Sequence, residues 1–62
     1  MNKYDALFDS NKSTLELRLD LFSIGEKIPA EDKDDFFEAY WRAHMIAADR
    51  EHELALARHY MM

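Results

Sequence analysis

The stretch Gly25-Glu26-Lys27-Ile28-Pro29 holds the only glycine and the only proline of the 62 residues. Glycine is favoured just past the end of a helix, and proline is favoured at the first position of one. Gly25 is therefore expected to close one helix and Pro29 to open the next. The sequence predicts an all-α helical hairpin, with a helix at about 14–24, a turn at 25–29 and a helix at about 30–60.

The second predicted helix contains no breaker, and acidic residues fill its first turn, where the helix dipole stabilises negative charge. At 100° per residue its apolar side chains form a stripe that alternates large and small residues. The stripe and its edge contain Phe36, Ala39, Tyr40, Ala43, Ala47 and Leu54. The stripe is clean to Ala48, after which Arg50, Glu51 and Arg58 interrupt it. We therefore expect helix–helix packing as far as Ala48, and shallower packing or polar contacts beyond it.

The first predicted helix allows two interpretations. Ser13 to Glu16 matches the capping box that begins a helix, whereas leucines at every second position from 15 to 21 have the period of a strand. Leucine without valine favours the helix, and a strand would need its own copy as a partner. Such a helix is apolar on two sides, which are Leu15, Leu19 and Phe22 on one and Leu17, Leu21 and Ile24 on the other. A homodimeric bundle is expected to bury the second of these stripes, with Ala39, Ala43, Ala47 and Leu54 also at helix–helix contacts. Before this helix, residues 3–9 could form a short helical turn that presents Tyr4, Leu7 and Phe8.

Composition excludes several classes of function. The chain is long enough for one domain at most, and without cysteine it has no disulfide or thiolate–metal site to support a small core. There is no run of about 20 apolar residues that could span a membrane, so a cytoplasmic location is predicted. A net charge of −5 argues against direct binding to nucleic-acid phosphates. No nucleophile–base pair or phosphate-binding loop occurs, and the three histidines lack metal-ligand spacing, so we expect no catalysis, no cofactor and no metal site.

Two groups of side chains are candidates for binding a protein partner. One is the aromatic cluster Phe36, Phe37, Tyr40 and Trp41, which could equally form the core. The other is the run of acids Glu31, Asp32, Asp34, Asp35 and Glu38, which could equally be a solvated first turn. Residues 26–38 hold six acids against two lysines, a net charge of −4 that would steer a basic partner. The sequence thus predicts a small acidic regulatory protein that acts through helix-face contacts. The alternative is an acidic inhibitor or nucleic-acid mimic that blocks a nucleic-acid-binding protein.

The segment LDLFSIGEKIPAEDKDDFFEAY, residues 19–40, resembles the turn region of Rop-type plasmid copy-number proteins. The shared features are a leucine-rich end of the first helix, an acid-rich turn with Ala30, and an acidic start of the second helix. The resemblance covers about a third of the chain, and the pair Gly25 and Pro29 lies where that family has none. It implies a hairpin that dimerises into a four-helix bundle and binds paired RNA loops. It identifies no RNA-binding residue here. A Rop-like RNA-binding dimer is the second alternative, and the arginine and histidine residues of the long helix would be its contacts.

Overall fold

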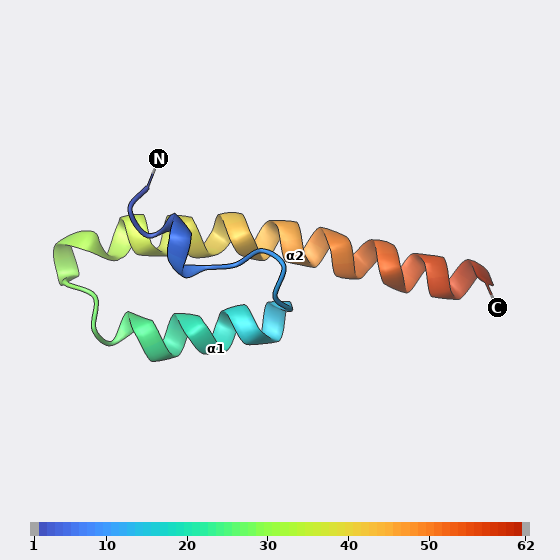
Figure 1. Cartoon of the computed structure of the whole chain (residues 1–62), viewed down its shortest axis with the longest axis horizontal. Coiled ribbons are helices and arrows are strands. Elements are labelled where there is room, and N and C mark those ends of the chain that lie inside the picture. Colours follow the sequence, from blue (N-terminus) through green and yellow to red (C-terminus); the bar gives the residue numbers. More distant parts are fainter. Residues whose placement is uncertain (1, 62) are drawn as a thin grey trace.

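The chain folds as an antiparallel helical hairpin (Figure 1). The computed structural model describes residues 2–61, with side chains described for 2–60. Helix α1 spans Thr14–Gly25 and helix α2 spans Lys33–Met61, and the short 3-10 helices η1 (Asp5–Leu7) and η2 (Ala30–Asp32) precede them. No residue from 2 to 61 lies in a strand. The predicted hairpin is confirmed, and so is the helical interpretation of residues 15–21.

Helix α1 begins at the predicted capping box. The Ser13 hydroxyl oxygen accepts a hydrogen bond from the Glu16 backbone N–H at 3.1 Å, and the hydroxyl donates to the Glu16 carboxylate at 3.3 Å. The side chain of Ser13 thereby satisfies one of the backbone N–H groups that the first turn of a helix leaves without an internal partner.

Gly25 ends α1 for a different reason from the predicted one. It is the last helical residue, and no residue from 2 to 61 has a positive φ, so Gly25 is not a left-handed cap. A Cβ atom at this position would lie 3.3 Å from Cε1 of Phe36, closer than ordinary carbon–carbon contact. The missing side chain therefore lets α1 approach the buried Phe36 ring at the closed end of the hairpin.

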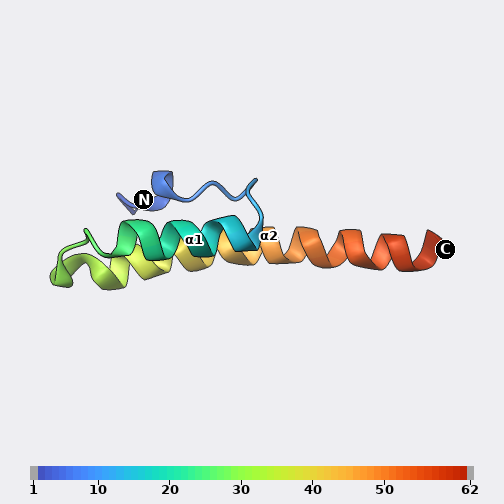
Figure 2. The ribbon, with the colours of Figure 1, turned by 90° about the horizontal axis from the view of Figure 1, so that it is seen from below.

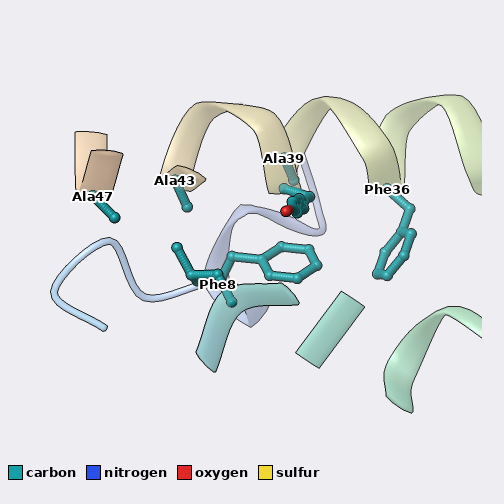
Figure 3. Close-up of a cluster of buried hydrophobic side chains, with 7 residues drawn as sticks. Phe8, Phe36, Ala39, Ala43 and Ala47 are labelled. Atoms are coloured by element: carbon teal, nitrogen blue, oxygen red, sulfur yellow. The ribbon is translucent and has the colours of Figure 1, made fainter. Parts of the chain in front are cut away.

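The N-terminal segment, residues 2–12, lies over one side of the hairpin as a third layer (Figure 2). Phe8 is buried, and its ring centroid lies 5.3 Å from that of Phe36 and 5.6 Å from that of Tyr40. Figure 3 shows the Phe8 ring next to the small side chains of Ala39 and Ala43. Ala39 and Ala43, which were expected at a contact between two helices, thus make room for the Phe8 side chain of this segment.

The core consists of seven buried residues, of which Leu17 is the only one from α1. Leu21 and Ile24 are half-buried against this cluster, so α2 of the same chain covers the stripe that was expected to face a second subunit. The opposite stripe of α1 is exposed. The buried residues are Phe8, Leu17, Phe36, Ala39, Tyr40, Ala43 and Ala47.

Arg50 and Glu51 of α2 form a polar clamp on the chain just before and at the start of α1. The Arg50 guanidinium donates to the carbonyl oxygens of Ser10 at 2.6 Å and Lys12 at 2.8 Å. The Glu51 carboxylate accepts from the Thr14 N–H at 3.0 Å and from its hydroxyl at 2.9 Å. The predicted change from apolar to polar contacts after Ala48 is confirmed.

Candidate interaction surface

The side of the hairpin that faces away from the N-terminal segment is not covered by any part of the described chain (Figure 2). A groove of about 270 Å³ runs there between the end of α1 and the start of α2. Its walls are mainly Leu21 and Phe22 of α1 and Phe36 and Phe37 of α2. Trp41 lies one turn after Phe37 and therefore on the same side of α2. We call the surface formed by Leu21, Phe22, Phe37 and Trp41 the open face.

Large aromatic side chains stand out into solvent on the open face. The exposed fractions are 66% for Phe22, 43% for Phe37 and 57% for Trp41. The structure thus divides the predicted aromatic cluster, because Phe36 and Tyr40 are buried in the core while Phe37 and Trp41 are available to a partner. Phe22, which the sequence assigned to self-association only, joins them from α1.

The rings of Tyr40 and His44 contact the Trp41 ring and restrict its orientation. Its ring centroid lies 5.3 Å from that of Tyr40 and 5.4 Å from that of His44, both in edge-to-face contact. His44 is in turn stacked on Tyr40, with centroids 5.4 Å apart and ring planes 17° from parallel. Contacts of this kind restrict a side chain before binding, which reduces the entropy that an anchor loses in a complex.

The acidic residues around the turn fall into two groups. Asp32 is half-buried and accepts hydrogen bonds from the Tyr4 hydroxyl at 2.7 Å and from Lys3 Nζ at 3.0 Å, and these bonds hold its pKa below the ordinary range. Glu38 pairs with Arg42 at 2.6 Å. The other predicted acids, Glu31, Asp34 and Asp35, are exposed and make no salt bridge within residues 2–60. They are therefore the acids whose charge is least compensated for a partner.

The remaining residues predicted for self-association lie in three environments. Leu15 and Leu19 are 61% and 60% exposed on the outer side of α1. Leu54 continues the core stripe of α2 but lies beyond the start of α1, so it is 55% exposed. The alanines at 39, 43 and 47 are buried within the chain.

Other kinds of site find little support among the described residues. The described residues contain no group of three side chains able to hold a metal ion. No helix among them is apolar over the length needed to cross a membrane. Two of the three arginines that a Rop-like RNA contact would use are engaged within the chain. Arg42 bridges Asp5 and Glu38, and Arg50 belongs to the polar clamp.

The chain matches no protein-family model, no curated protein and no solved structure. The surface that offers most for binding is the open face, because large aromatic side chains are exposed on it.

Proposed function

We propose that this protein is a non-enzymatic interaction or regulatory protein that packs its open face against an amphipathic helix of another polypeptide. The observation that supports this most is the exposure of Phe22 and Phe37 on opposite walls of one groove, with the exposed Trp41 one turn after Phe37 on α2. Aromatic side chains dominate the energetics of protein interfaces, and a small soluble protein seldom leaves several of them together in water.

The shape of the groove favours a helix as the partner. Two antiparallel helices leave a furrow between them into which the side chains of a third helix can pack. A helix in such a groove places anchors three or four residues apart. Glu31, Asp34 and Asp35 lie at the same end of the hairpin, so they would attract a helix that carries Lys or Arg at its flank.

Trp41 is the only tryptophan, so its fluorescence reports directly on the open face. The probe is a synthetic amphipathic peptide of leucine and lysine, compared with its leucine–glutamate counterpart at equal length. We expect a saturable blue shift of Trp41 emission with the lysine peptide and a much weaker response with the glutamate peptide.

Two variants test where the peptide binds. Phe37→Ser should weaken binding about tenfold or more, the loss typical of an interface anchor. Ile46→Ser is the matched control, because Ile46 is 56% exposed but lies on the side of the N-terminal segment beside Phe8. At a protein concentration where the chain is monomeric, absence of any response of Trp41 to either peptide at low salt contradicts the proposal, as does equal weakening by both substitutions.

The second candidate is an acidic mimic that occupies the basic site of a nucleic-acid-binding protein. It is favoured by Glu31, Asp34 and Asp35, three exposed acids near the turn that form no ion pair within residues 2–60. Mimicry predicts that binding falls steeply with added salt and is lost in the double variant Asp34→Asn with Asp35→Asn. Packing of a helix on the open face predicts a modest dependence on salt and loss in Trp41→Ala.

A further inference from the structure

We infer that the helix that covers the open face is α2 of a second copy of this chain, which runs antiparallel to the first. This inference rests on the proposed function, because it names the occupant of the same face. Three features of the structure carry it: the length of α2, the order of large and small side chains along it, and the distribution of charge.

Helix α2 is much longer than the part of the chain that covers it. Its 29 residues extend about 44 Å, against about 18 Å for the 12 residues of α1. After Glu51 every residue from 52 to 60 is exposed, and this part of α2 projects beyond the hairpin (Figure 1). A helical segment of only nine residues without tertiary contacts is marginal in water. The projecting segment therefore needs a cover that the described chain does not supply.

The stripe of α2 that forms the open face continues onto this projecting segment. At 100° per residue, Phe37, Trp41, Ala48 and Ala55 lie on one side of the helix. The stripe is thus aromatic at the end beside α1 and small at the projecting end. When such a helix pairs with its own copy, only the antiparallel orientation places the large side chains of one helix against the small side chains of the other.

Antiparallel pairing around Ala48 matches large with small side chains. Trp41 and Ala55 each lie seven residues from Ala48, so the Trp41 of either copy falls opposite the Ala55 of the other. Two-fold symmetry makes this match twice, as an isologous interface requires. Parallel pairing would instead set tryptophan against tryptophan and alanine against alanine, which produces a clash at one end and a void at the other.

Charge favours the same orientation. The turn region 26–38 carries a net charge of −4, whereas the projecting residues 52–60 carry one acid, one arginine and two histidines. Antiparallel copies keep the two acid-rich turns at opposite ends and bring Arg58 of each copy to the level of Glu38, at the edge of the acid-rich region of the other. Parallel copies would bring two regions of charge −4 together, where they repel.

The available area is of the right order for a dimer. A standard interface covers about 800 Å² on each partner, and a large aromatic side chain covers about 150–250 Å² when fully buried. With Phe22, Phe37 and Trp41 each near half exposed, these three supply about 300 Å² of it. The projecting segment and the exposed flank of α1 can supply the rest.

Introduced cysteines test the pairing cleanly, because the chain has none of its own. Ala48→Cys, at the symmetry axis, should form a disulfide-linked dimer on mild oxidation. Ala55→Cys should not, because its two copies would be about 21 Å apart in the antiparallel pair, beyond disulfide reach. Asp49→Cys is the matched control: it neighbours position 48 but is exposed on another side of α2. Cross-linking of Ala55→Cys as fast as Ala48→Cys indicates parallel pairing and overturns the inference.

Sedimentation equilibrium of the unmodified chain needs no variant and decides the oligomeric state. We expect a dimer, with the dimer dissociation constant raised about 30-fold or more in Trp41→Ala and little changed in Ile46→Ser. A monomer that still binds the leucine–lysine peptide overturns the second copy as the occupant and leaves the proposed function intact. A monomer that binds no peptide overturns both.

Discussion

Replacement of Gly25 by alanine should destabilise the hairpin, although alanine is the better helix former. Gly25 is the last residue of α1 and has no positive φ, so alanine fits the backbone and would gain up to about 0.5–1 kcal/mol from helix propensity and reduced chain entropy. At a helix end only about half of this gain is expected.

The cost comes from Phe36. The new Cβ would lie 3.3 Å from Cε1 of a ring that is 1% exposed, so the ring must move by a few tenths of an ångström within a packed core. Overpacking of this kind costs about 1–3 kcal/mol. The net expectation for Gly25→Ala is a loss of about 0.5–2.7 kcal/mol, or a fall in the melting temperature of several degrees or more.

A double-mutant cycle with Phe36→Leu isolates the contact. Leucine does not extend to the position of Cε1, so Gly25→Ala should become neutral or stabilising in that background, with a coupling of about 1 kcal/mol or more. The assay is urea unfolding of all four proteins, followed by circular dichroism at constant protein concentration. If Gly25→Ala is as stable as the parent chain, or costs the same in both backgrounds, the close approach to Phe36 is not why glycine is needed here.

Two further predictions use the same unfolding assay. Leu17→Ala should cost about 2–5 kcal/mol because the side chain is fully buried, whereas Leu19→Ala, at a position 60% exposed, should cost less than about 0.5 kcal/mol; equal losses would mean that α1 presents a different side to α2. Acid should also destabilise the fold, because hydrogen bonds from Thr14 lower the pKa of Glu51, and those from the Tyr4 hydroxyl and Lys3 lower the pKa of Asp32. These contributions are complete above the ordinary pKa values of 4.5 and 3.8 and are lost as the pH falls through the lowered ones. Unfolding measured from neutral pH to about pH 2 should show this loss, and a Glu51→Gln variant that keeps the full acid dependence would contradict the assignment for Glu51.

The hairpin itself could be predicted from sequence because its signals are local. A capping box at Ser13 and an apolar stripe that is clean from Phe36 to Ala48 need no knowledge of the rest of the chain. The orientation of α1 could not be predicted in the same way. Its two leucine stripes are equally apolar, and the one that turns inward lies on the side where Gly25 approaches Phe36 and Thr14 meets Glu51.

The candidate site was predicted in part, for a similar reason. Periodicity placed Phe37 and Trp41 on a flank of the stripe, but whether a flank is buried depends on what the N-terminal segment covers. The sequence of this segment indicated a short helical turn that presents Tyr4, Leu7 and Phe8, but not which side of the second helix that turn would cover. Small residues at 39 and 43 were the available clue, because close-packed interiors place a large side chain opposite a small one.

The two sides of α2 show which contacts this chain makes within itself and which it leaves to another polypeptide. On the covered side, Ala39 and Ala43 are small enough for Phe8 to enter, and the contact closes within the chain. On the open face, Phe37 and Trp41 are 43% and 57% exposed, and no part of the described chain covers them. Side chains of that size need a partner with a recess, and the recess that α2 itself offers is the small-residue end of the same stripe, at Ala48 and Ala55. The size gradient along one helix therefore accounts both for the exposed aromatics and for the uncovered end of α2.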